Sequence, residues 1–152
     1  MIQRKQTLFL LLAVVALAAC LAMNIGSFEP QGMGVSARMT NFTVVSAAKA
    51  SVEYPVFPLA ILLMLACVID IWAIFRYNNR MLQARLCVRS VLLLVCWCVL
   101  YAVYGLFLVP QELAFRLALP AALPVVAGIL TVMARSGIMA DERLVRAADR
   151  IR

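Results

Sequence analysis

The chain has 152 residues, of which 66% are hydrophobic and only 14% are charged. Soluble domains are usually about half apolar and about a quarter charged, so a soluble fold of this length has too little interior for so much Leu, Val and Ala. The formal net charge is +7, but the basic residues lie between apolar stretches rather than in a basic domain of their own. The composition therefore predicts an integral membrane protein and argues against a nucleic-acid partner.

Four apolar stretches are long enough to cross a bilayer, because a spanning helix needs about 20 mostly apolar residues. The predicted spans cover residues 7–25, 56–75, 86–109 and 117–134. Together they occupy most of the chain and leave no room for a separate soluble domain. The predicted class is an all-α membrane protein, a four-transmembrane-helix bundle that forms a single membrane domain.

The basic residues are divided unequally between the two sides of the predicted bundle. Eleven of the 14 fall on one side: Arg4, Lys5, Arg76, Arg80, Arg85, Arg89, Arg135, Arg143, Arg146, Arg150 and Arg152. The remaining three, Arg38, Lys49 and Arg116, fall on the other side. Segments rich in Lys and Arg stay in the cytoplasm, so both termini are predicted to be cytoplasmic.

The first extracytoplasmic loop, residues 26–54, is long and contains several helix breakers. Its middle, residues 35–45, is rich in Thr, Val and Phe, which are typical of strands. The sequence therefore predicts a short β-hairpin in this loop, packed on the membrane surface.

The C-terminal segment, residues 137–152, is too polar to span the membrane. One helical stripe of this segment is apolar: Leu144, Val145, Ala148 and Ile151. Glu142 and Arg146 are four residues apart and are expected to pair. This pattern predicts an amphipathic helix that lies on the membrane face or against a partner.

The first apolar stretch has two interpretations. Leu17-Ala-Ala-Cys20 matches a bacterial lipoprotein signal, in which case the stretch is cleaved and Cys20 carries lipid. The apolar run continues to Ile25, however, which is typical of an uncleaved span. The other three spans keep their orientation in either case.

No pattern in the sequence indicates a catalytic, cofactor or metal site. The chain has no histidine, which removes Ser-His-Asp and Cys-His catalytic arrangements and every His-based metal site. The five cysteines lie inside or beside apolar stretches, where small buried free thiols are expected rather than disulfides. We therefore predict a protein that is not an enzyme and has no cofactor.

Asp70 is the one acidic residue inside a predicted span, and an ionisable residue at that depth is a candidate functional site. It lies six residues before Arg76, about 9 Å from the end of the helix. If the second and third helices form a tight hairpin about Met81, Arg89 can reach Asp70 by snorkelling. The candidate intramembrane pair is Asp70 with Arg89, and a proton or ion relay and simple hydration are the alternatives.

The basic connector between the second and third spans, residues 76–85, also has two interpretations. It is either a determinant of topology alone or a site for anionic lipid head groups or an acidic partner surface. The residues of this candidate cytoplasmic interaction face are Arg76, Arg80, Gln83, Arg85, Arg146 and Arg150.

Three strings in the chain resemble a known family. They are Met1-Ile-Gln-Arg-Lys-Gln-Thr7, Tyr77-Asn-Asn-Arg-Met-Leu-Gln-Ala-Arg-Leu-Cys87 and Asp141-Glu-Arg-Leu-Val-Arg-Ala-Ala-Asp-Arg-Ile-Arg152. They are similar to the Bacteroidetes membrane-protein family catalogued as domain of unknown function 4293, along the whole chain. The resemblance implies a small four-helix inner-membrane protein with an uncleaved first helix, and it implies no activity or catalytic residue.

Two functions are compatible with these observations. The leading hypothesis is a non-enzymatic accessory or scaffold subunit that holds a larger membrane assembly through its helices and cytoplasmic face. The alternative is a small oligomeric transporter or channel in which Asp70 lines a path.

Overall fold

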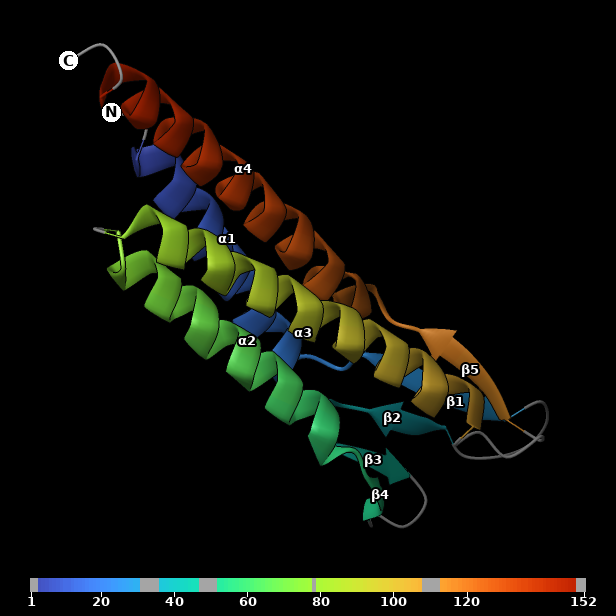
Figure 1. Cartoon of the computed structure of the whole chain (residues 1–152). Coiled ribbons are helices and arrows are strands. Elements are labelled where there is room, and N and C mark those ends of the chain that lie inside the picture. The colour runs from blue at the N-terminus through green and yellow to red at the C-terminus, as the bar shows by residue number, and fades with distance from the viewer. Residues whose placement is uncertain (1–2, 31–35, 47–51, 78, 108–112, 150–152) are drawn as a thin grey trace.

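The computed structural model describes residues 3–30, 36–46, 52–77, 79–107 and 113–149, which form a helical bundle with a small β-sheet at one end (Figure 1). The elements in chain order are α1 (Gln3–Ala22), β1 (Gly26–Pro30), β2 (Ala37–Met39), β3 (Thr43–Ser46), β4 (Val52–Pro55), α2 (Phe57–Phe75), α3 (Arg80–Phe107), β5 (Leu113–Leu117), the 3₁₀-helix η1 (Leu119–Ala122) and α4 (Leu123–Asp149).

All four α-helices are long and apolar enough to cross a membrane, as predicted. Each packs against two others, so that α1 contacts α2 and α4, and α3 contacts α2 and α4. Small residues with no exposed surface, such as Ala13, Ala66, Ala127 and Ala134, lie at these contacts and allow close approach of the helices. Many large apolar side chains face outward instead, where a bilayer supplies their apolar surroundings.

The sheet at one end of the bundle has five antiparallel strands in the order β4-β3-β2-β1-β5. The predicted hairpin is present as β2 and β3, with Arg38 opposite Val45. The first loop contributes two further strands, and the second loop contributes β5, which pairs with β1 along its whole length. The sheet is therefore larger than predicted and joins the two loops on this side of the bundle.

The predicted start of the fourth span was wrong. Residue 117 was expected to begin a helix, but Leu117 ends strand β5 and lies opposite Gly26 of β1. Pairing with β1 satisfies the backbone groups of this apolar segment, which local hydropathy alone cannot reveal. Helix α4 begins six residues later at Leu123, with Pro124 in its first turn, where the missing N–H of proline costs no helical hydrogen bond.

The connector between α2 and α3 is shorter than the predicted residues 76–85. Helix α2 ends at Phe75 and α3 begins at Arg80. The side chain of Asn79 caps this start, because its Oδ1 accepts a hydrogen bond of 3.3 Å from the Leu82 amide. Most of the basic connector is therefore the first turns of a helix.

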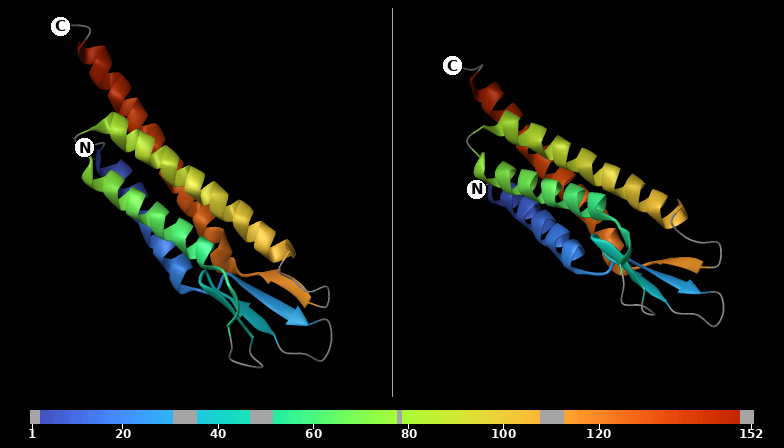
Figure 2. Two further views of the ribbon diagram at one scale, coloured as in Figure 1. Left: turned by 60° about the horizontal axis from the view of Figure 1, so that its bottom comes forward. Right: turned by 90° about the horizontal axis from the view of Figure 1, so that it is seen from below.

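The C-terminal segment is helical, as predicted, but it does not form a separate helix. Helix α4 runs without a break from Leu123 to Asp149, and its last turns extend beyond the α2–α3 turn (Figure 2). Gly137 lies within this helix and faces α1. A Cβ atom at this position would lie only 3.1 Å from Gln6 Cγ, so the glycine allows the two helices to pack closely. The predicted ion pair between Glu142 and Arg146 is confirmed, with Nε and Oε1 3.1 Å apart.

The two ends of the bundle differ in the way that the charges predict. Both chain termini and the α2–α3 turn lie at one end, which we call the terminal end, and the sheet lies at the other (Figures 1 and 2). The terminal end therefore brings together the segments that carry most of the basic residues.

Candidate intramembrane site and interaction face

Helix α2 places Asp70 inside the bundle. The buried residues of this helix recur every three or four positions and form one stripe: Leu59, Ala60, Leu63, Ala66, Asp70 and Ala73. Asp70 has no exposed surface, so it faces the other helices and not the lipid. Ionisable residues in spanning helices usually face the bundle interior in this way and mark functional positions.

Ser90 of α3 lies close to Asp70 across the α2–α3 interface, and it too has no exposed surface. Within the described part of the chain, neither Asp70 carboxyl oxygen has a hydrogen-bond partner, and neither has Ser90 Oγ. The interface thus contains a small buried polar site whose oxygen atoms have no hydrogen-bond partner among the described residues.

The predicted pair of Asp70 with Arg89 is not formed in this structure. Arg89 is exposed, and among the described residues no ion pair joins it to Asp70. Neighbouring residues of a helix point in different directions, so when Ser90 faces Asp70 its neighbour Arg89 faces away. The prediction located the right turn of α3 but the wrong face.

The six residues of the predicted interaction face have different surroundings. Arg76, Arg85 and Arg146 are exposed, as an interaction face requires. Arg80 is partly buried and its Nη1 donates a hydrogen bond of 3.4 Å to the Asp141 carbonyl. Gln83 is only 5% exposed. It belongs to helix α3 and lies on the side of that helix that faces the bundle, so it is not part of the interaction face. Arg150 lies outside the described residues.

Asp141 connects three helices at the terminal end, a role that the sequence analysis missed. Gln6 of α1 donates from Nε2 to Asp141 Oδ2 at 2.5 Å, and Arg80 of α3 donates to the Asp141 carbonyl. Asp141 looked like one charged residue among several in a polar tail, and only the packing of α1 against α4 shows its role.

A second buried network, at the sheet end, was also missed. Asn41 has no exposed surface; its Nδ2 donates to the Cys20 carbonyl at 2.7 Å, and its Oδ1 accepts from Trp97 Nε1 at 3.2 Å. Tyr101 stacks on Trp97 with ring centroids 5.0 Å apart and donates from its hydroxyl to the Ile25 carbonyl. The sequence places Asn41 in the segment of the predicted hairpin, residues 35–45, and gives no sign that its side chain is buried.

These arrangements contain polar binding groups but little that indicates chemistry. Among the described residues, no group of three or more His, Cys, Asp or Glu side chains could hold a metal ion. All five cysteines are free, as predicted.

Comparison with known proteins confirms the family that the three strings indicated. The family model described as Domain of unknown function (DUF4293) matches residues 2–151. No curated protein matches the chain.

Proposed function

The chain belongs to the DUF4293 family, and on that premise we propose that it is a non-enzymatic accessory or scaffold subunit of an assembly in a bacterial inner membrane. The observation that carries the proposal is the end of α4. There Leu144 is 63% exposed and Val145 is 43% exposed, on helical turns that extend past the α2–α3 turn (Figure 2).

The exposed apolar residues at this end are not required by the packing of the bundle. Beside them stand Arg143 and Arg146, both exposed. An apolar pair flanked by cations on a projecting helix suits a partner whose surface is apolar with an acidic rim. The proposed orientation, with both termini in the cytoplasm, presents this surface to cytoplasmic or membrane-bound partners.

Affinity purification from the native membrane in mild detergent, with a tag after Arg152, tests the proposal. We expect a stoichiometric partner, identified by mass spectrometry, that is lost when Leu144 and Val145 are both replaced by Gln. Leu117→Gln is the matched control, because Leu117 is 73% exposed at the opposite end of the bundle. Recovery of the chain alone, or an unchanged partner with the double variant, would overturn the proposal.

The alternative, a small oligomeric transporter or channel, is favoured by one observation. The polar site of Asp70 and Ser90 is buried between two spans with no hydrogen-bond partner for either side chain in the described part of the chain. Ion or proton flux into liposomes that is abolished by Asp70→Asn, and unchanged by Glu29→Gln at the sheet end, would support this function. Liposomes that show no flux with the unmodified protein would remove it.

A further inference from the structure

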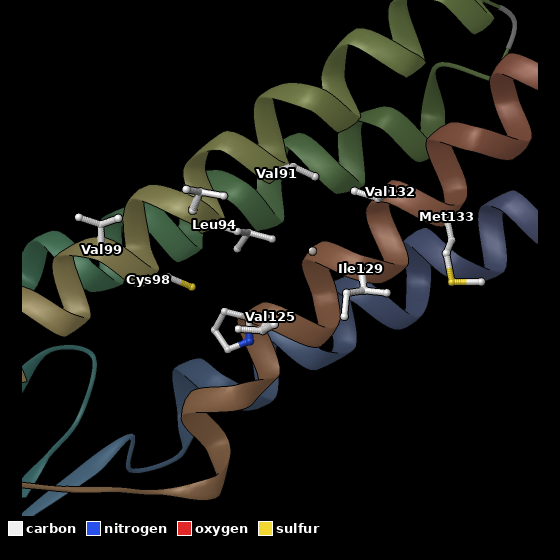
Figure 3. Close-up of a pocket in the computed structure, with 11 residues that line it drawn as sticks. Val91, Leu94, Cys98, Val99, Val125, Ile129, Val132 and Met133 are labelled. Atoms are coloured by element: carbon white, nitrogen blue, oxygen red, sulfur yellow. The ribbon is translucent and has the colours of Figure 1, made fainter.

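An apolar groove runs between α3 and α4 on the outer surface of the bundle. It has a volume of about 420 Å³. Leu94 and Cys98 of α3 line one side, and Pro124, Gly128 and Val132 of α4 line the other (Figure 3). The α4 positions extend over two turns of helix, so the groove is about 12 Å long.

The groove exists because Gly128 lacks a side chain where α3 and α4 face each other. A Cβ atom added at Gly128 would meet Leu94 Cδ1 at 3.7 Å, an ordinary van der Waals distance, so the two helices leave unfilled space here. All the residues that line the groove are apolar, and such a space does not hold water stably. At this depth in a spanning bundle, the available apolar molecules are the acyl chains of lipids.

The end of the groove nearest the terminal end of the bundle is positively charged. Arg135 and Ser136 follow Val132 by three and four residues, so they lie on the same face one turn further along α4. Arg135 is exposed, and the residue before it, Ala134, belongs to the same buried cluster as Cys87 of α3, so Arg135 lies beside the contact between α4 and α3. Arg135 is also the first charged residue after the apolar residues 117–134, and a charged residue that follows an apolar stretch is expected near the lipid head groups.

Further along the same two helices lie two more cations, Arg80 and Arg143. Of the acidic residues nearby, Glu142 pairs with Arg146, and Asp141 accepts a hydrogen bond from Gln6 and contributes a single negative charge. The end of the groove nearest the terminal end therefore has an excess of positive charge next to an apolar surface. This combination complements a molecule with one anionic head and an apolar chain.

We propose that the α3–α4 groove binds one anionic phospholipid, with an acyl chain lying along the groove over Leu94 and Gly128 and the phosphate on Arg135. The guanidinium group is suited to this task, because it binds phosphate oxygens through two parallel hydrogen bonds. The lipid comes from the leaflet at the terminal end, which is the cytoplasmic leaflet in the proposed orientation. The site does not depend on the proposed role as a subunit.

Native mass spectrometry of the purified full chain tests the proposal, after exchange into micelles that contain equal amounts of phosphatidylglycerol and phosphatidylcholine. We expect one retained phosphatidylglycerol. Arg135→Gln should weaken its retention about fivefold relative to phosphatidylcholine, the effect of one basic residue near a lipid surface. Arg89→Gln is the matched control, because Arg89 is exposed near the end of α3 that lies at the terminal end of the bundle. Val91 lines the groove, and Arg89, two residues away on the helix, points away from the face that carries Val91.

Filling the groove should remove the lipid whatever its head group. Gly128→Leu does this from inside the groove, and Val132→Phe does it from a side chain that is 49% exposed and not part of the core. Thermal unfolding confirms that each variant is folded. The proposal is overturned if folded Val132→Phe retains phosphatidylglycerol like the unmodified protein, or if Arg89→Gln weakens retention as much as Arg135→Gln does. It is also overturned if a second copy of the chain occupies the groove, which would be seen as a dimer that Val132→Phe dissociates.

Discussion

The side chain of Asn41 joins the sheet to two helices through hydrogen bonds. It reaches the last turns of α1 at Cys20 and the middle of α3 at Trp97, and all these atoms are buried. Buried polar groups in such a network keep their stability only while every member has a partner. Asn41 is therefore expected to contribute more to stability than its position in a turn suggests.

Replacing Asn41 by Ala should lower the free energy of unfolding by about 2 to 3 kcal/mol, because it leaves the Cys20 carbonyl and the Trp97 N–H without partners. Trp97→Phe, which leaves only Asn41 Oδ1 without its donor, should cost less. Thermal or denaturant unfolding in mild detergent measures both. Phe42→Ala is the control: its side chain is 41% exposed next to Asn41, and a change below about 0.5 kcal/mol is expected. Equal losses for Asn41→Ala and Phe42→Ala would contradict the network.

Asp70 shows the opposite behaviour, a buried polar side chain whose presence does not help the fold. With no hydrogen-bond partner in the described part of the chain, its carboxyl group is desolvated without compensation. Asp70→Asn should raise the free energy of unfolding by about 1 kcal/mol, because a neutral amide costs less to bury than a carboxylate. Functional sites commonly have a stability cost of this kind.

Ser90→Ala identifies the source of the gain. Ser90→Ala alone should change stability by less than about 0.5 kcal/mol. In a double-mutant cycle Asp70→Asn should gain as much in that background, because the gain comes from removing the buried charge. A loss of stability with Asp70→Asn would show instead that the carboxyl group has a partner such as a bound water or cation.

At the scale of elements, Phe115 joins β5 to the end of α3 and to β1. Its ring lies 5.2 Å from that of Phe28 and 5.8 Å from that of Tyr101, measured between centroids. Gly105 of α3 and Gly26 of β1 make room for this ring, because a Cβ atom on either would come within 3.0 Å of it. The aromatic cluster and the two glycines thus fix how the second loop meets the bundle.

Gly105→Ala should destabilise the protein by about 2 kcal/mol, because the new methyl group displaces the Phe115 ring. The sign is informative, since Gly to Ala in a helix otherwise stabilises by up to about 1 kcal/mol. Gly128→Ala in α4 is the matched control and should show that gain, because its Cβ atom meets only Leu94 at an ordinary distance. Unfolding measurements should also show that Phe115→Leu recovers part of the loss in the Gly105→Ala background. A gain with Gly105→Ala would mean that Phe115 does not pack against α3.

The ion pair of Glu29 and Arg116 also joins β1 to β5, but it should matter much less. The two side chains approach to 2.9 Å while remaining 42% and 70% exposed, so solvent screens their attraction. Replacing Glu29 by Gln should change the free energy of unfolding by less than about 0.5 kcal/mol. A loss as large as that from Gly105→Ala would show that the ion pair, and not the aromatic cluster, holds the second loop.

At the scale of the whole molecule, the two ends of the bundle should lie on opposite sides of the membrane. A fluorescent protein fused after Arg152 should fold and emit, and alkaline phosphatase fused at the same place should be inactive, because both termini are proposed to be cytoplasmic. Alkaline phosphatase inserted after Ser46, the last residue of β3, should be active. The reverse pattern would invert the proposed orientation and move the lipid site to the other leaflet.

The number of spans and the separation of charge were determined by the sequence alone. A spanning helix satisfies its own backbone hydrogen bonds, so its existence depends only on a local apolar stretch of sufficient length. The same local character explains why the β2–β3 hairpin and the pair of Glu142 with Arg146 were predicted correctly.

The tertiary structure decided everything that depends on distant neighbours. Strand β5 exists because β1, from the other loop, pairs with it. Gln83 is buried because it lies on the side of α3 that packs against the other helices. The face of α3 opposite Asp70, the roles of Asn41 and Asp141, and the groove beside Gly128 all arise from contacts between helices and strands far apart in the chain. Such contacts have no local pattern, because the free energy of each one is set by the shape and polarity of a surface that only the folded chain assembles.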